Sequence, residues 1–208
     1  LVVWTSDRIE LADWFISQLA RSAEFKEHVR DLVETGLYLS RHRYQWDQPI
    51  ELGKMYSRKD VCRLLNWKDN QQGTMFGYKF DLHTNTCPIF VTYHKGDDVS
   101  ASTLYGDSFI NEKTLHWFSK SRKTLQSPDV QRIVSNSFEL HLFAKKDDAE
   151  GTDFYYLGRA TSSNPVQTQM PGDNGNKLDV VTMDPNLESP IEAALYDYLS
   201  TGPVIKGQ

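Results

Sequence analysis

The sequence has few of the features that mark secreted and membrane proteins. It contains only two cysteines, Cys62 and Cys87, among 208 residues, which excludes a disulfide framework and a zinc site built on cysteine pairs. No stretch approaches the roughly 20 apolar residues that a membrane helix needs, and no basic-then-apolar leader indicates secretion. We therefore predict a cytoplasmic protein with two reduced thiols and no membrane partner. Because the first residue is Leu1 rather than Met, we expect a piece of a longer protein.

The chain also lacks the short motifs of the common enzyme classes. It has no Walker loop, no Gly-x-Gly-x-x-Gly, no Gly-x-Ser-x-Gly and no His-Glu-x-x-His. Its six histidines include no i, i+4 pair and no cysteine partner at metal spacing. The acidic cluster from Asp147 to Asp153 is flanked by lysines, which favours a solvated hairpin turn over a magnesium or calcium site. The sequence therefore predicts a domain without catalytic residues, metal or cofactor.

Positive charge is concentrated in two stretches, although the net charge is -5. Residues 54–68 hold five basic residues against Asp60 alone, and residues 113–132 hold five against Asp129 alone, so each stretch carries five minus one, a local +4. Charge segregated in this way can steer an anion to one face of a protein.

The apolar pattern predicts an α+β fold with a curved antiparallel sheet or a small open barrel. Residues 1–36 show helical periodicity and are read as a helical arm or a lead-in from an upstream domain, with Ser6 as a candidate N-cap. Residues 37–190 form the α+β domain, and residues 191–208 form a C-terminal helix and tail. Within the domain, alternation predicts strands near 75–80, 88–93, 138–143, 154–160 and 178–183, and the Pro-, Gly-, Asn- and Gln-rich residues 162–177 predict a long loop.

Aromatic and basic side chains are interleaved in both positive stretches. Phosphate contacts need Lys, Arg and hydroxyl donors, and an unstacked base needs flat side chains. The sequence therefore predicts a nucleic-acid-binding surface formed by Tyr56, Arg58, Lys59, Arg63, Trp67, Trp117, Ser119, Lys120, Ser121, Arg122 and Lys123. The alternative is a surface loop whose Trp117 belongs to the core.

Three runs in the chain resemble a known bacterial family. They are Tyr56-Ser57-Arg58-Lys59-Asp60-Val61, Gly73-Thr74-Met75 and Pro88-Ile89-Phe90-Val91-Thr92. Together with His116-Trp117-Phe118-Ser119-Lys120-Ser121-Arg122 and Leu140-His141-Leu142-Phe143, they resemble a bacterial domain of unknown function that follows superfamily 2 helicase cores, often with a phospholipase-D-like nuclease ahead of them. The resemblance covers roughly residues 37–190. The same pattern is more loosely similar to the SRA-like domain of McrA-type, modification-dependent restriction enzymes.

The looser resemblance implies a PUA-like curved barrel that flips a modified cytosine out of duplex DNA, and hence a reader in a helicase or restriction system of phage defence. It implies DNA as one partner and a helicase core, in the same or a partner chain, as another. Candidates for the base pocket are Tyr56, Asp60, Phe76, Tyr78, Trp117 and His141. Asn66-Trp67 stands where the looser pattern has a Gly-Gly pair, which changes the expected pocket.

Two of these candidates have a second interpretation. Asp60 either accepts a hydrogen bond from the base or caps the helix that begins at Ser57. His141 lies on the face of its strand opposite Leu140 and Leu142, where it either lines a cleft or faces water.

Two functions of different classes follow from these observations. One is a reader of modified DNA, and the other is an accessory module that docks on a helicase without reading DNA. A nuclease needs a carboxylate–lysine cluster that the sequence does not supply. The reader hypothesis requires the two positive stretches to meet around one hollow large enough for a nucleotide.

Overall fold

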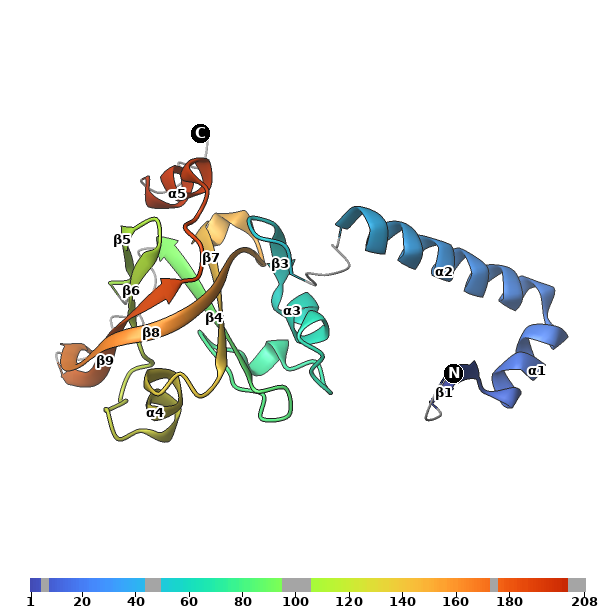
Figure 1. Ribbon diagram of the computed structural model, residues 1–208, viewed down its shortest axis with the longest axis horizontal. Helices are drawn as coiled ribbons and strands as arrows, with labels where there is room; N and C mark the ends of the chain where they lie inside the picture. Colours follow the sequence, from blue (N-terminus) through green and yellow to red (C-terminus); the bar gives the residue numbers. More distant parts are fainter. Residues whose placement is uncertain (5–7, 44–49, 95–105, 173–175, 202–208) are drawn as a thin grey trace. The chain divides into compact units, whose positions relative to one another are not determined.

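The computed structural model describes residues 1–4, 8–43, 50–94, 106–172 and 176–201. The chain divides into two compact units, residues 1–49 and residues 50–208 (Figure 1).

The first unit is a small strand pair followed by two helices. Strand β1 (Val2–Trp4) pairs antiparallel with β2 (Ile9–Leu11), and helices α1 (Asp13–Arg21) and α2 (Ala23–Arg43) follow. The helical arm predicted over residues 1–36 differs at both ends: residues 9–11 pair as a strand before α1 begins, and α2 continues past residue 36 to Arg43. The predicted N-cap Ser6 lies outside the described residues.

The second unit is built on one seven-stranded sheet with the order β4-β7-β8-β9-β6-β5, and β3 pairs with β8 beside this path. The strands are β3 (Met55–Ser57), β4 (Thr86–His94), β5 (Ser108–Asn111), β6 (Thr114–Phe118), β7 (Glu139–Asp147), β8 (Asp153–Pro171) and β9 (Lys177–Leu187). The predicted α+β class with a curved sheet is confirmed (Figure 1). The pair β4–β7 is parallel, whereas every other pair in this sheet is antiparallel.

The prediction of a long loop at residues 162–177 is wrong, because most of these residues belong to a strand. Strand β8 runs on to Pro171 and pairs with β9 as far as Lys177. A register shift between Ser163 and Val166 accommodates Asn164, whose φ is +49°. Exposed polar residues occupy much of this part of β8, so its composition resembles that of a loop although its backbone pairs with β9 on both sides of the register shift.

In the described part of this unit, three helices accompany the sheet: α3 (Arg58–Leu64), α4 (Pro128–Val134) and α5 (Ala193–Ser200). Single helical turns, η1 (Gln72–Thr74) and η3 (Asp148–Glu150), lie in the connections. Helix α3 begins as predicted, because the Ser57 hydroxyl accepts a hydrogen bond from the Asp60 backbone N–H at 3.1 Å. Helix α4 begins with proline at its first position.

The sheet buries side chains on both faces of β4 and β7. One cluster contains Leu140 and Leu142 of β7 with Val130 and Ile133 of α4 and Leu199 of α5. The alternate residues of the same strands form a second, aromatic cluster, in which Phe90 stacks on Phe143 with centroids 4.8 Å apart and meets Phe154 at 5.1 Å. A strand buried on both faces cannot expose a polar row, which explains the near-continuous apolar run Cys87–Val91.

Candidate nucleic-acid interface

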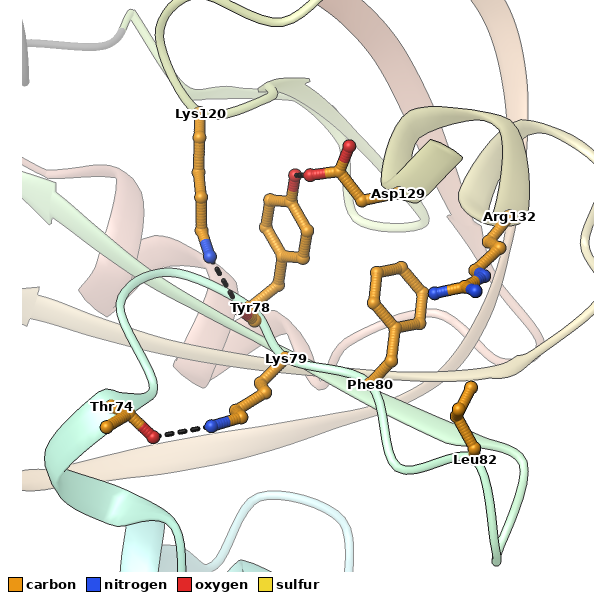
Figure 2. Close-up of a pocket in the computed structure, with 8 residues that line it drawn as sticks. All are labelled: Thr74, Tyr78, Lys79, Phe80, Leu82, Lys120, Asp129 and Arg132. Carbon is orange, nitrogen blue, oxygen red and sulfur yellow. Dashed lines mark hydrogen bonds between the residues drawn. The ribbon is translucent and has the colours of Figure 1, made fainter. Parts of the chain in front are cut away.

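A pocket of about 350 Å³ lies between the segment that precedes β4, the turn after β6 and helix α4. Figure 2 shows the side chains that surround it. The lining residues are Thr74, Tyr78, Lys79, Phe80, Leu82, Lys120, Asp129 and Arg132. We call this cavity the Tyr78 pocket.

Two aromatic rings form the apolar part of the Tyr78 pocket. Tyr78 is almost fully buried and packs edge-on against Trp117, with centroids 5.4 Å apart, and against Phe80 at 5.9 Å. Phe80 in turn meets Phe138 edge-on at 4.9 Å. Rings interlocked in this way have little freedom to rotate, so the apolar wall is preformed.

A carboxylate anchors the Tyr78 phenol. The phenol donates a hydrogen bond to Oδ2 of Asp129 at 2.7 Å, and the Lys123 ammonium lies 2.9 Å from the same oxygen. Burial raises the pKa of Asp129, but the hydrogen bonds from Tyr78 and Lys123 outweigh it and hold that pKa below its usual value. The other oxygen, Oδ1, is buried and has no hydrogen-bond partner among the described residues.

Three cations line the Tyr78 pocket. The Lys120 ammonium donates to the Tyr78 carbonyl at 3.0 Å and lies 4.2 Å from the centroid of the Tyr78 ring. The Lys79 ammonium donates to the Thr74 hydroxyl, and the Arg132 guanidinium lies 5.7 Å from the centroid of Phe80 (Figure 2). Burial lowers the pKa of Lys120, although the charge of Asp129 partly opposes this shift.

A second, wider depression of about 940 Å³ adjoins the Tyr78 pocket. The two share Phe80 and Leu82, and the second is also lined by Asn66, Trp67, Lys68, Asp69, Gln71, Asp81 and His83. We call it the Trp67 groove. The first positive stretch therefore contributes Lys68 to the groove, and the second contributes Lys120 and Arg132 to the pocket beside it.

Several residues predicted for the interface lie in or directly behind these two cavities. Tyr78 and Lys120 line the pocket, Trp67 lines the groove, and Trp117 supports Tyr78 from the core. The Lys123 ammonium forms an ion pair with the Asp129 carboxylate.

Ser119 is fully buried, and its hydroxyl accepts a hydrogen bond from the Val181 backbone N–H at 2.9 Å. It therefore joins the turn after β6 to β9. Ser121 is half-buried in this turn, and Arg122 is exposed there with a φ of +63°.

The structure places other predicted residues away from the Tyr78 pocket. Arg58 lies over Phe90 and Phe154 in the aromatic cluster, at 5.2 and 4.7 Å from their centroids. Tyr56 is fully buried, and its hydroxyl accepts a hydrogen bond from the Glu51 backbone N–H. Lys59 and Arg63 are exposed on α3. None of these four residues, which were predicted for the interface, lines the Tyr78 pocket.

The three remaining candidates for the base pocket, Asp60, Phe76 and His141, do not line the Tyr78 pocket. Asp60 is at the start of α3, where its carboxylate accepts from the Ser57 hydroxyl at 2.9 Å. Phe76 is 73% exposed and does not line either cavity.

His141 is buried rather than facing water. Its Nδ1 lies 3.0 Å from the Tyr156 hydroxyl, whereas Nε2 lies 2.9 Å from Glu139 without hydrogen-bond geometry. Burial lowers the pKa of His141, against the opposing charge of Glu139.

Lys79, Phe80 and Arg132 line the pocket but were not among the residues predicted for the site. The run Tyr78-Lys79-Phe80 carries the same aromatic–basic alternation as the chosen stretches and could have been included on that ground. Asp129 and Arg132 are three residues apart on α4, a spacing that places side chains on one helix face. Their proximity to Tyr78 depends on tertiary packing.

The described residues offer neither a metal cluster nor a membrane span. Among them, no group of three or more His, Cys, Asp or Glu side chains is placed to hold a metal ion. None of the helices in the described part of the chain is long and apolar enough to cross a bilayer.

Comparison with known proteins gives several solved structures, two of which are described below, and one family. No curated protein is similar in sequence to this chain. KRYPTONITE in complex with mCHG DNA and SAH aligns at 12% identity over 69% of this chain and 33% of its own, with a TM-score of 0.44. The sulfur binding domain and SRA domain of ScoMcrA, complexed with phosphorothioated DNA, aligns at 11% identity over 72% of this chain and 44% of its own, with a TM-score of 0.45.

This chain thus spans less than half the length of each of these structures. One family model matches residues 50–199. That range contains the whole seven-stranded sheet, the Tyr78 pocket and the Trp67 groove. The chain therefore belongs to the family described as domain of unknown function DUF3427.

Proposed function

We propose that residues 50–199 form a non-catalytic DNA-binding domain that reads a modified base, such as methylated or hydroxymethylated cytosine, by taking one nucleotide out of the duplex. The observation that carries this proposal is the composition of the Tyr78 pocket. Aromatic rings, three cations and a carboxylate oxygen without a partner line the same cavity.

Each of these groups suits one part of a nucleotide. Stacking of a base on an aromatic side chain contributes about 1–3 kcal/mol, which offsets much of the few kcal/mol that extrusion from the duplex costs. Phe80 offers such a ring at the point where the pocket and the groove meet. The free Oδ1 of Asp129 suits the exocyclic amine of cytosine, which is a donor.

Other exposed charges of the domain suit the DNA backbone. Lys68 lines the Trp67 groove, and Lys59, Arg63 and Arg122 are exposed in the two positive stretches. Contacts of this kind to phosphates supply affinity without sequence choice. The proposed interface therefore combines non-specific backbone contacts with one selective pocket.

The proposal includes a biological setting. The resemblance of the sequence to helicase-linked domains supports a role in a helicase or restriction protein of phage defence. A helicase core, in the same or a partner chain, is then the protein partner.

The test is fluorescence anisotropy of the 208-residue chain with matched duplexes that carry plain, methylated or hydroxymethylated cytosine, at several salt concentrations. We expect salt-sensitive binding to all three and tighter binding to a modified one. Equal affinity for the three duplexes would remove the claim of modification reading. Absence of salt-sensitive binding would remove the claim of DNA binding.

A variant of the pocket ties the activity to the site. Phe80→Leu keeps an apolar side chain but removes the ring face, so we expect about a tenfold loss of affinity for the preferred duplex. Ile110→Ala, at an exposed apolar position on β5, is the matched control. An unchanged preference in Phe80→Leu would place recognition elsewhere on the domain.

A docking module is the second candidate, and one observation favours it. The first unit exposes many large apolar side chains, among them Trp14, Leu32 and Tyr38. Exposed apolar surface of this extent is typical of protein interfaces. Capture of a helicase core by the chain, together with no salt-sensitive DNA binding, would favour docking over reading.

A further inference from the structure

The three cations of the Tyr78 pocket are held in place by uncharged groups. Lys79 donates to the Thr74 hydroxyl, and Lys120 donates to the Tyr78 carbonyl. Arg132 lies over the rings of Phe80 and Phe138, at 5.7 and 5.8 Å from their centroids. In the part of the chain that the structure describes, none of these three cations forms an ion pair with a carboxylate.

The acidic group of the pocket does not balance them. Among the described residues, Asp129 is the one carboxylate that lines the pocket, and its Oδ2 is already bound by Tyr78 and Lys123. Burial lowers the pKa of Lys120, and the charges of Lys123 and Lys79 add to this effect against the opposing charge of Asp129. The chain as a whole has 28 acidic and 23 basic residues, so a group of cations without carboxylate partners is not a consequence of composition.

We propose that Lys79, Lys120 and Arg132 form a binding site for a phosphate group. Phosphate accepts charge-assisted hydrogen bonds from several directions, and a guanidinium can bind it through two parallel bonds. The neutral anchors position the cations without reducing their charge, so an incoming anion meets an ordered site.

This inference deepens the proposed function and rests on it for the source of the phosphate. The source is either the monoester at a DNA 5′ end or a diester of the backbone beside an extruded nucleotide.

The direct test uses inorganic phosphate as the probe. The ¹⁵N-labelled 208-residue chain is titrated with sodium phosphate and, in parallel, with sodium chloride at matched ionic strength. We expect saturable shifts, specific to phosphate, at the amides of Lys79, Phe80, Lys120, Asp129 and Arg132. Identical shifts with both salts, or shifts that map to another surface, would overturn the proposal.

Substitutions of the pocket lysines test whether these cations bind the phosphate. The double variant Lys79→Gln, Lys120→Gln is expected to weaken phosphate binding by about tenfold or more, because bonds to charged groups are lost. Lys113→Gln removes the same charge from an exposed position between β5 and β6 and should bind as the wild type does. Lys79→Arg keeps the charge and should retain binding, which separates loss of the site from loss of the fold. Unchanged affinity in the double variant would overturn the proposal.

Duplexes with 5′-phosphate and 5′-hydroxyl ends distinguish the two sources. A terminal site gives tighter binding to the phosphorylated duplex, and the double variant abolishes this preference. A backbone site gives equal binding to both duplexes, and the double variant reduces the salt dependence of both.

The phosphate site and the proposed function can fail separately. DNA binding without any response to inorganic phosphate overturns the phosphate site and leaves the DNA-binding function standing. A phosphate response in the pocket without duplex binding supports the phosphate site and overturns the DNA-binding function.

Discussion

The phenol of Tyr78 donates a hydrogen bond of 2.7 Å to Asp129, a residue 51 positions later in the chain. This bond links the segment that precedes β4 to helix α4 and sets one wall of the Tyr78 pocket (Figure 2). Lys120 holds the backbone of Tyr78, and Lys123 holds the carboxylate of Asp129. The pocket thus depends on contacts that neither segment could form alone.

Substitution of Asp129 tests this relationship through pH. The hydrogen bonds from Tyr78 and Lys123 outweigh burial and lower the folded-state pKa of Asp129. Its contribution to stability is therefore present above the unfolded pKa of about 3.9 and is lost as the pH falls through the lower folded value. In urea denaturation, Asp129→Asn should be less stable than wild type at neutral pH, and the difference should shrink as the pH falls below about 4.

Asp197→Asn, at an exposed position on α5, is the control and should change stability little at either pH. A difference between wild type and Asp129→Asn that is constant across this range would contradict the proposed network.

Arg58 provides a test of a structural role against a DNA-binding one. Its guanidinium lies over Phe90 and Phe154, and its Nε is buried without a hydrogen-bond partner among the described residues. We expect Arg58→Ala to lower the free energy of unfolding by about 1–2 kcal/mol, because it removes cation–π contacts and packing. DNA affinity should fall less than in Phe80→Leu.

Arg63→Ala, on the exposed surface of the same helix, should change stability by less than about 0.5 kcal/mol. A larger loss of DNA affinity in Arg58→Ala than in Phe80→Leu would move the interface toward the aromatic cluster.

Gly158 marks a point where the backbone of β8 requires glycine. Its φ is +126°, and a Cβ atom added there would lie 3.2 Å from the Leu52 side chain. Gly158→Ala should therefore destabilise the domain by about 1–3 kcal/mol. Gly73→Ala is the control, since no heavy atom lies within 4 Å of its added Cβ and its φ is not positive. Equal thermal unfolding midpoints for the two variants would contradict the strain at Gly158.

If the domain extrudes a base as proposed, Leu82 is placed to enter the gap left in the base stack. It is 70% exposed, yet it lines both the Tyr78 pocket and the Trp67 groove. Its hairpin is fixed by hydrogen bonds from Thr84 to the Asp81 carboxylate and from Trp67 to the Thr86 hydroxyl. Apolar side chains presented in this way can wedge between base steps.

We expect Leu82→Ala to leave stability within about 0.5 kcal/mol of wild type. It should also reduce the fluorescence increase of a 2-aminopurine placed next to the target base. An undiminished increase in Leu82→Ala would show that another residue separates the bases.

The sequence predicted the elements whose signals are local. The Ser57–Asp60 cap marked a helix start, because capping acts over three or four residues. Alternation located β7, since Leu140 and Leu142 share one face of the sheet, although the opposite face of this strand is buried as well. The far half of β8 was missed because an exposed paired strand has the composition of a loop.

The types of group available for binding can be read from the sequence, which shows interleaved aromatic and basic side chains and no catalytic or metal motif. Which of these side chains share a cavity depends on the tertiary structure. Arg58 and Phe90 lie in the aromatic cluster, whereas Tyr78, Lys120 and Asp129 line the Tyr78 pocket. The reason is physical: the interior side of a strand or helix can be read from its periodicity, but a pocket forms where distant segments meet, and those contacts depend on the packing of the whole sheet.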